Sequence, residues 1–528
     1  MAKFSSSRAR PNVFHVVRTT GVRGPTHEGG DGYERDAKSE LFLLAVSNFV
    51  SETTFYESAS HRDDRFEQLV AKVTAEDPDW VRRMIPWLRN EAQMRSASLV
   101  AAAEYVKAGG ASGRQVVSAA LERADEPAEM LAYWHQRHGR RVPKPVKRGV
   151  ADAVVRLYSE RAALKYDGHA RVWRMADVIE LVHPEPRDGK QSALFKYLLD
   201  KRHDRVVDLP DELGLIGLAQ QVVQRIATGE DVPATDIASA GITWERQSGA
   251  TQMDAAAWQR QIPSMGYMAL LRNLRNFDQA GISDESVQLV VAKLANVDEI
   301  AQSRQFPMRF LSAYKAVESE RWKPALEKAL ELSMVNVPRL AGKTLVLVDV
   351  SGSMVSAMSG RSELQRWEVA ATFGAAIATR AENADLYAYS SAHSGGAFRR
   401  GRGFARLGAN ADRKERIDFG AGASIFTVLS RIRGSRCFNG GTQTWQTVAE
   451  TYAGHDRVFI LTDEQAFSGG SDPGPDAIPL IYTWNLGGYL PAHNQSGERG
   501  RYTFGGLTDK SFAAVALLEA AKDGTWPF

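Results

Sequence analysis

The spacing of hydrophobic residues divides the chain into a long helical part and a shorter part in which strands alternate with helices. From residue 37 to residue 337, apolar residues recur every three to four positions, as in Gln115–Arg123 and Glu285–Val297. Short breaks that hold Gly, Pro or Asp separate these segments, for example at Gly109–Gly110 and Pro184–Pro186. Such a succession of short amphipathic helices is typical of a stacked helical-repeat array. Because no strict period is visible, the pattern predicts a degenerate all-α solenoid.

The pattern changes near Pro338. Lys343–Asp349 is a continuous run of β-branched residues and leucine, which indicates a strand buried on both faces. Strand candidates follow at Ala384–Ser390, Arg457–Asp463 and Pro479–Trp484, and helix candidates at Glu363–Arg380, Ser424–Arg433, Thr444–Ala453 and Lys510–Lys522. This alternation predicts a doubly wound, mainly parallel α/β sheet with helices on both faces.

Three regions follow from these patterns. Residues 1–36 are rich in Ser, Gly, Arg and Pro and show little periodicity, so we predict an N-terminal arm and not a packed element. Residues 37–337 form the predicted all-α domain, and residues 338–528 the predicted α/β domain. A length of 528 residues agrees with several domains, because one hydrophobic core seldom extends so far. The Gly- and Arg-rich segment Ser391–Phe419 shows few strand signals.

Composition narrows the class of protein. A hydrophobic fraction of 44% and a charged fraction of 24% are typical of a soluble globular protein. No apolar run reaches the roughly 18 residues of a membrane span, and no apolar signal core follows the N-terminus. We therefore expect a cytoplasmic location and no membrane contact. The net charge of +3 decides nothing about nucleic acids, because a local basic face can be hidden in a balanced total.

Oxygen-bearing side chains gather where the predicted strands of the α/β domain end. Asp349, Ser351 and Ser353 follow the first buried strand with D-x-S-x-S spacing, so the turn can direct all three toward one point. Thr442 follows a Gly-Gly pair before a helix, and Asp463 ends another buried strand. Carboxylate and hydroxyl oxygens suit a hard divalent cation. The pattern predicts a site for one Mg²⁺, with Mn²⁺ or Ca²⁺ as alternatives.

Simpler interpretations of the same residues stay open. Asp349 can merely cap the next helix while the hydroxyls complete a turn. Thr444 competes with Thr442 for the hydroxyl position, although the preceding glycines favour Thr442. A metal-dependent hydrolase is disfavoured, because there is no histidine cluster and no nucleophile–base pair. The single cysteine, Cys437, excludes an internal disulfide framework and is expected to be a packed thiol and not a nucleophile.

Both halves resemble known modules. The Asp349–Met354 turn, Gly440–Thr442 and the strand ending at Asp463 together resemble the metal-ion-dependent adhesion site of von Willebrand A domains. The helical part resembles the TROVE module of Ro ribonucleoproteins. The phrases that carry this second resemblance are Ala176–Pro184, Gly266–Arg275 and Pro307–Lys315, and Thr462–Gly470 also resembles that family's version of the strand end.

The resemblance implies a fold and a function. HEAT-like helices would close into a ring with a basic hole, and a von Willebrand A (Rossmann-like) domain would join its ends. The expected activity is binding of small noncoding RNA of the Y RNA type, with 3′ ends of misfolded RNA entering the hole. Such proteins act in RNA quality control or maturation with exoribonucleases and are not known as enzymes. We expect a monomer that binds RNA and not DNA.

Basic residues give independent but weaker support for RNA binding. His135–Arg148 is the densest basic stretch, and its prolines and glycine predict a loop entering a helix. The candidate RNA contacts are Arg137, Arg140, Arg141, Lys144, Lys147, Arg148, Arg161, Lys165 and Arg174, together with His183, which is carried over from the resemblance alone. Tyr133 and Trp134 are aromatic neighbours that could stack on bases, although core packing is the more common role of such a pair. A solvated linker is the alternative for the whole stretch.

A second function class explains the metal site without RNA. A protein-interaction adaptor would act through the predicted α/β domain alone, by presenting the cation to an acidic side chain of another protein. This alternative leaves the basic residues of the helical part without a role. Salt-sensitive RNA binding would discriminate between the two classes, because the adaptor predicts none.

Overall fold

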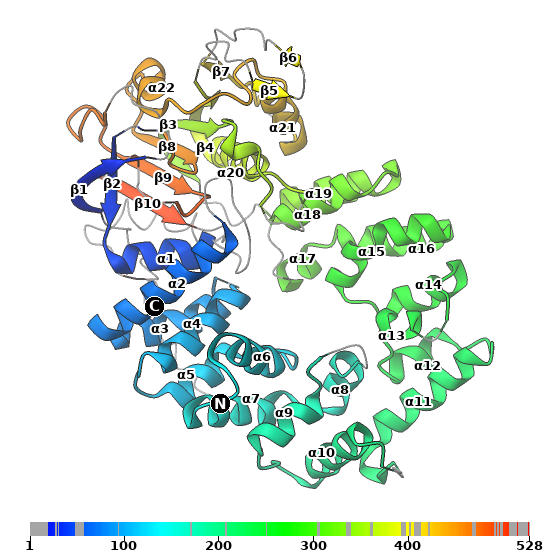
Figure 1. Cartoon of the computed structure of the whole chain (residues 1–528). Helices are drawn as coiled ribbons and strands as arrows, with labels where there is room; N and C mark the ends of the chain where they lie inside the picture. The colour runs from blue at the N-terminus through cyan, green and yellow to red at the C-terminus, as the bar shows by residue number, and fades with distance from the viewer. Residues whose placement is uncertain are drawn as a thin grey trace, which may run out of the picture. The chain divides into compact units, whose positions relative to one another are not determined.

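The computed structural model describes residues 19–26, 29, 31–47, 58–92, 94–168, 172–205, 209–249, 251–303, 307–333, 339–358, 363–391, 398–400, 403–405, 413–420, 423–466, 471–489, 493, 496, 500–505, 515, 526 and 528. The chain forms two compact units (Figure 1). The helical unit comprises Glu67–Gln305 and Arg309–Ala329, and the sheet unit comprises Met1–Phe66, Phe306–Met308 and Leu330–Phe528. No helix among the described residues is long and apolar enough to cross a membrane.

Short helices follow one another through the helical unit, as the apolar spacing predicts, and the first and the last two α-helices of the series extend partly beyond its bounds. They are α2 (Ala59–Glu76), α3 (Pro78–Asn90), α4 (Arg95–Lys107), α5 (Gly113–Ala120), α6 (Glu126–His138), α7 (Lys144–Leu157), α8 (Glu160–Tyr166), α9 (Met175–Val182), α10 (Gly189–Arg202), η1 (Asp211–Leu213), α11 (Gly214–Ala227), α12 (Ala234–Ser239), α13 (Trp244–Ser248), α14 (Ala255–Gln261), η2 (Ile262–Ser264), α15 (Tyr267–Ala280), α16 (Asp284–Leu294), α17 (Val297–Ser303), α18 (Pro307–Ala316), η3 (Glu320–Trp322) and α19 (Lys323–Ser333). Contacts run mainly between helices close in sequence, such as α3 with α4, α5 with α7 and α9 with α10. This pattern confirms the predicted all-α helical-repeat class.

Side-chain caps fix where many of these helices begin. The carboxylate of Asp188 accepts a hydrogen bond from the backbone N–H of Gln191 at 2.7 Å, and α10 starts between them. Asp254 and Ser283 cap α14 and α16 in the same way. Each such cap stabilises its helix by about 1 kcal/mol. The breaks between apolar segments therefore carry the signals that separate the helices.

One glycine sets the distance between α5 and α7. A Cβ on Gly149 would lie 2.6 Å from the carbonyl oxygen of Arg114 and 2.7 Å from the Cβ of Val117. We expect Gly149→Ala to lower the free energy of unfolding by about 2 kcal/mol, because the side chain must push the two helices apart. Denaturant titration followed by circular dichroism measures this change. Gly214→Ala is the control, since a Cβ there meets nothing within 4 Å; equal losses in both variants would contradict the close-packing argument.

The sheet unit contains a six-stranded sheet in the order β10-β9-β8-β3-β4-β7. Its strands are β3 (Leu340–Asp349), β4 (Ala381–Tyr389), β7 (Lys414–Arg416), β8 (Arg457–Thr462), β9 (Ile481–Asn485) and β10 (Arg501–Gly505). The neighbouring strands pair in parallel except for β4 and β7. Three of its helices are α20 (Arg366–Arg380), α21 (Ile425–Arg433) and α22 (Thr444–Thr451). A separate antiparallel hairpin joins β5 (Phe398–Arg400) to β6 (Gly403–Ala405).

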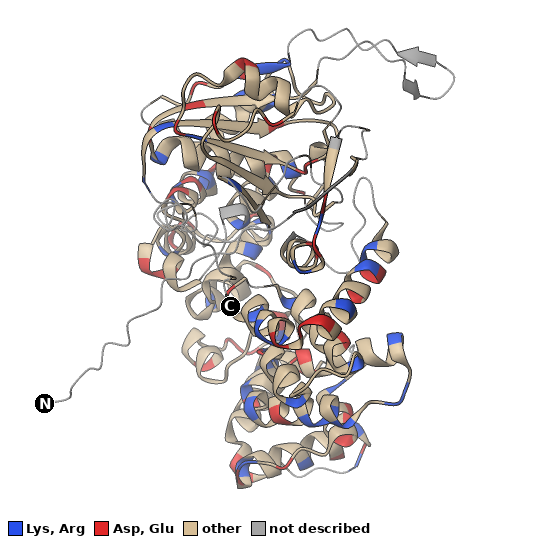
Figure 2. Ribbon diagram, turned by 90° about the vertical axis from the view of Figure 1, so that its left-hand side faces the viewer, with Lys and Arg blue, Asp and Glu red and all other residues tan. Residues whose placement is uncertain are grey.

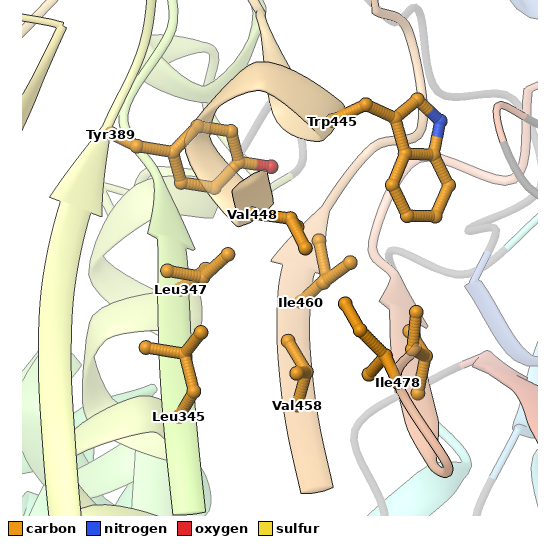
Figure 3. Close-up of a cluster of buried hydrophobic side chains, with 9 residues drawn as sticks. Leu345, Leu347, Tyr389, Trp445, Val448, Val458, Ile460 and Ile478 are labelled. Atoms are coloured by element: carbon orange, nitrogen blue, oxygen red, sulfur yellow. The ribbon is translucent and has the colours of Figure 1, made fainter. Parts of the chain in front are cut away.

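Both faces of the central strand β3 are covered. Leu345 and Leu347 point to the same side as Val458 and Ile460 of β8 and pack under α22, together with Val448 (Figure 3). On the other side, the intervening residues Val346 and Val348 lie against Gly374 of α20. Alternate side chains of one strand thus enter two cores, which explains the unbroken apolar run and confirms the predicted doubly wound α/β class. The closing helix predicted at 510–522 falls outside the described residues.

The N-terminal prediction was wrong for the residues that the structure describes. β1 (Thr19–Pro25) and β2 (Asp31–Arg35) form an antiparallel pair in the stretch expected to be an arm. Arg35 is 6% exposed and forms an ion pair with Glu464, and the hydroxyl of Thr26 donates to the carbonyl oxygen of Ala466 at 2.7 Å. These contacts anchor the segment to the sheet unit, although polar, glycine-rich sequence gives no local sign of them.

The boundary predicted at residue 37 also differs from the observed one. α1 (Ala37–Ser47) groups with the sheet unit and contacts β10. Its residues Leu41–Val46 are all buried, so the helix has no exposed stripe over this run. A helix that is apolar on all sides belongs in a core between layers, whereas a solenoid helix keeps one polar face.

Candidate metal centre and nucleic-acid interface

The topology of the sheet brings two aspartates together. The chain leaves β3 toward β4 on one side, and β8 lies on the other side of β3. This is the point where the strand order reverses, and ligands of open α/β sheets bind outside the carboxyl ends of the strands at such a point. Asp349 is the last residue of β3, and Asp463 directly follows β8. Both side chains are fully buried.

The turn after β3 folds back on Asp349. Its Oδ1 accepts a hydrogen bond from the backbone N–H of Ser351 at 2.9 Å, and its Oδ2 accepts one from the Thr462 hydroxyl at 2.6 Å. The hydroxyl oxygens of Ser351 and Ser353 lie 3.4 Å apart, and Ser353 also hydrogen-bonds to Asp463. The D-x-S-x-S spacing therefore gathers its three side chains in the way that the sequence predicts.

Backbone hydrogen bonds tie the glycine loop to this turn. The N–H of Gly352 donates to the carbonyl of Gly440 at 2.8 Å, and the N–H of Asn439 donates to the carbonyl of Val350 at 2.8 Å. A Cβ on Gly440 would lie 2.3 Å from the hydroxyl of Ser390, so the loop fits only without a side chain there. Thr442 follows two residues later and is 2% exposed.

The competing threonine has another partner. The Thr444 hydroxyl lies 3.2 Å from the phenolic oxygen of Tyr389, and Thr444 is the first residue of α22. Because this contact occupies its side chain, the geometry favours Thr442 as the hydroxyl closer to the turn.

The electrostatics of the two aspartates favour a cation. Burial, with the nearby negative charge of Asp463, raises the pKa of Asp349 to about 7. Burial likewise raises the pKa of Asp463, although Arg366 at 3.7 Å opposes the rise. The Oδ2 atom of Asp463 has no hydrogen-bond partner. Two close carboxylates with an unpartnered buried oxygen are destabilised unless positive charge compensates them.

The donor set fits a hard divalent ion and no softer one. It offers two carboxylates and hydroxyls, and no sulfur or imidazole, which suits Mg²⁺ better than Zn²⁺. Among the described residues, no group of three or more His, Cys, Asp or Glu could hold a metal ion, so hydroxyls or water must complete any such site. Cys437 is buried, with its Sγ 3.4 Å from the carbonyl oxygen of Ala388, which agrees with a packed thiol.

A buried polar network next to Asp463 escaped the sequence analysis. Arg366 donates to the Tyr489 hydroxyl at 2.7 Å, and Arg35 donates to the Tyr489 carbonyl at 2.9 Å and pairs with Glu464. These residues come from distant parts of the chain, so their spacing in the sequence does not predict the network. Only Glu464 lies in a segment, Thr462–Gly470, that the sequence singles out. The network fixes the backbone on which Asp463 is held.

The densest basic stretch does form a loop that enters a helix. Gly139 ends α6 with a φ of 81°, a conformation that favours glycine, and Pro143 precedes α7. Arg140, Arg141, Lys144 and Arg148, here called the basic surface, are exposed, and none of their side chains forms a hydrogen bond or ion pair with a described residue. Burial, together with the charge of Arg140, lowers the pKa of nearby His135.

Several other basic candidates pair with carboxylates or are partly buried. Arg137 donates to Glu67 at 2.7 Å, and Lys147 is half-buried. Arg174, a predicted RNA contact, is 7% exposed and pairs with Asp167 at 3.1 Å. Arg161 and Lys165 of α8 are exposed. Across the helical unit, Lys and Arg are interspersed with Asp and Glu, so basic character is local (Figure 2).

The aromatic pair beside the basic stretch is structural. Trp134 is 3% exposed, and its indole N–H donates to the Arg141 carbonyl at 3.0 Å. The Tyr133 hydroxyl donates to Glu104 at 2.7 Å. Core packing is thus confirmed for Trp134, whereas Tyr133 is half-buried and held by its hydrogen bond to Glu104. The Trp134 contact also holds the loop that carries Arg141.

His183 lies in a groove. It is exposed in a left-handed conformation at the end of α9, where its N–H donates to the Ile179 carbonyl at 2.9 Å. The groove has a volume of about 590 Å³, and Lys196, His203 and Arg205 also line it. Arg205 pairs with Asp200, whereas Lys196 is exposed and pairs with no described carboxylate. Sequence spacing did not single out these three residues, because the fold alone brings α9 and α10 together.

Known proteins resemble both parts of the chain. The model of the TROVE domain matches residues 238–334. RNA-binding protein RO60 of Deinococcus radiodurans is 27% identical over 233 residues, which cover 39% of this chain and 42% of that protein. Telomerase protein component 1 of Mus musculus is 37% identical over 78 residues, or 14% of this chain and 3% of that protein. The chain thus spans less than half the length of these curated relatives.

A solved structure shares the fold. The crystal structure of the Deinococcus radiodurans RO (RSR) protein superimposes with a TM-score of 0.62 at 18% sequence identity, and covers 91% of this chain and 100% of that chain. This likeness confirms the predicted fold class, HEAT-like helical repeats followed by a von Willebrand A-like domain. At this level of identity, the structural similarity is evidence for the fold alone.

Proposed function

We propose that this chain, as a member of the TROVE-domain family of Ro proteins, is an RNA-binding scaffold for a small structured noncoding RNA of the Y RNA type. The observation that carries this proposal is the basic surface: four exposed cations within nine residues that pair with no described carboxylate. Cations without partners attract phosphates, whose release of counterions gives sequence-independent affinity. α7, which carries Lys144 and Arg148, packs against α9, whose end carries His183.

The finer features of the proposal come from the resemblance. Single-stranded 3′ ends of misfolded RNA would bind in the ring that the resemblance implies, and an exoribonuclease would process them. The protein would act in the cytoplasm as a monomer and without chemistry of its own.

The metal centre is the second part of the proposal. Asp349, Ser351 and Ser353 would hold one Mg²⁺ directly, and Thr442 and Asp463 would do so directly or through water. The bound ion would compensate the two buried carboxylates and offer an open position to an acidic side chain of a partner protein. The Oδ2 of Asp463, which accepts no hydrogen bond from a described residue, and the all-oxygen donor set support this assignment.

A protein-interaction adaptor stays as a second candidate. The buried carboxylate pair favours it, because a metal centre at the edge of a sheet serves protein contacts equally well without RNA. This candidate predicts that a partner protein binds in a manner that requires Asp349. It also predicts that no RNA binds to the basic surface.

Recovery of RNA from the native host tests the choice. We expect the chain, purified and washed at moderate salt, to retain one or two structured small RNAs enriched over a control protein, as read by sequencing. The Asp349→Asn variant should retain the same RNAs, because its metal site lies in the other unit. If no RNA is enriched with the parent chain, the scaffold is wrong and the adaptor is favoured.

A further inference from the structure

A second cavity lies wholly within the helical unit. It has a volume of about 450 Å³ and is bounded by α8, the loop before α13, η2 and the start of α15. Ile242, which lines it, belongs to a buried apolar cluster with Ala240 and Val232. A cavity of this size with a buried apolar floor is typical of a preformed site for a small ligand.

One end of the cavity suits an anion. α15 begins there after Gly266, which has no side chain to cap the helix. The backbone N–H groups of Tyr267 and Met268 precede the first helical hydrogen bond and face no intrahelical acceptor. Arg161 and Lys165 of α8 line the same cavity, are exposed, and form no ion pair with a described residue. Two cations and a helix N-terminus together favour a phosphate.

A buried acceptor indicates that the ligand also carries a donor. Gln261 lines the cavity and is 2% exposed. Its amide nitrogen donates to the Ile242 carbonyl at 2.9 Å and to the Ser264 hydroxyl at 3.1 Å, which fixes the orientation of the amide. The amide oxygen has no partner. The phosphate group of a nucleotide cannot satisfy it, because a phosphate monoester that has lost both protons offers no hydrogen to donate.

The remaining wall offers an aromatic ring and a carboxylate. Trp244 is half-buried, and the packed ring of Trp258, at a centroid distance of 5.8 Å, holds it in place. Glu245 also lines the cavity and can accept hydrogen bonds from hydroxyls. An aromatic face beside acceptors is the usual environment of a base and its ribose.

We propose that this cavity binds a phosphorylated ribonucleoside. The phosphate lies toward Arg161, Lys165 and the start of α15, a hydroxyl or amine of the ligand donates to Gln261, and the base lies along Trp244. The ligand is either a free nucleotide or the terminal nucleotide of a single-stranded RNA. Only the second source rests on the proposed RNA function.

Calorimetric titration of the full chain tests the cavity. We expect adenosine 5′-monophosphate to bind at least about tenfold more tightly than adenosine or inorganic phosphate, because each lacks one half of the contacts. The double variant Arg161→Gln/Lys165→Gln should lose at least about tenfold in affinity for the monophosphate. The control Lys72→Gln/Lys107→Gln removes two exposed cations of the helical unit outside the cavity and should leave that affinity unchanged. Equal binding of adenosine and its monophosphate, or no loss in the first variant, would overturn the proposal.

Competition separates the two sources. A short single-stranded RNA with a terminal phosphate should displace the monophosphate if the cavity holds an RNA end. If it does not, while the monophosphate still binds, a free nucleotide is the ligand. Binding of the monophosphate without any binding of structured RNA would sink the proposed RNA function and leave the cavity assignment standing.

Discussion

Replacing Arg140, Arg141 and Arg148 with glutamate is expected to weaken binding of the structured small RNA on the order of 1000-fold at 0.15 M salt. Each charge-assisted contact to a phosphate contributes about 1.5 kcal/mol or more, and three such losses approach three powers of ten. The logarithm of affinity should also fall less steeply with the logarithm of salt concentration, by about one unit for each lost phosphate contact. Filter binding or fluorescence anisotropy at several salt concentrations measures both effects.

A matched control makes the result specific to the basic surface. Arg82, Arg225 and Arg260 are also arginines of the helical unit, but each pairs with a carboxylate: Asp79, Glu230 with Asp236, and Asp231. Their replacement with glutamate changes net charge equally and breaks only surface ion pairs, each of which contributes at most about 1 kcal/mol to stability. Similar losses of RNA affinity in both variants would mean that net charge alone drives binding, and the proposed interface would be wrong.

Local structure explains the side-chain placements that could be predicted from the sequence. Asp349, Ser351 and Ser353 lie within five positions, so one buried strand and one turn bring them together whatever the rest of the chain does. The same holds for the basic surface, because Gly139 and Pro143 define a short loop into α7. Predictions of this kind depend on a few neighbouring dihedral angles and not on the packing of distant elements.

The failures involve ion-pair partners that the local sequence pattern does not reveal. Arg35 and Glu464 are 429 positions apart, and nothing near Arg35 indicates that it is buried. Arg174 carries the same charge as the exposed arginines, yet its side chain is buried in an ion pair with Asp167. Residue type thus predicts chemistry, whereas exposure depends on which carboxylate the fold brings near. This is also why Lys196 in the His183 groove went unnoticed.

The second large effect is expected on Mg²⁺ affinity when the metal centre is mutated. We expect Asp349→Asn to reduce Mg²⁺ affinity by at least about 1000-fold, because the substitution removes the charge of the carboxylate at the centre of the turn and leaves a neutral amide. In the parent chain, Mg²⁺ at about 100 times its Kd should stabilise the folded state by about 2.7 kcal/mol. The midpoint of thermal unfolding should therefore rise with Mg²⁺ in the parent chain and not in the variant.

Two further variants show whether the coordination is as proposed. Thr442→Val removes one buried hydroxyl and should weaken Mg²⁺ binding by about tenfold, since one neutral oxygen contributes less than a carboxylate. Asp476→Asn removes an exposed carboxylate elsewhere in the sheet unit and should change nothing. RNA affinity should stay the same in all three variants, because the basic surface belongs to the other unit. If Mg²⁺ still raises the midpoint of thermal unfolding of the Asp349→Asn variant, the ion binds elsewhere. The compensating charge for the buried pair of Asp349 and Asp463 would then come from Arg366 alone.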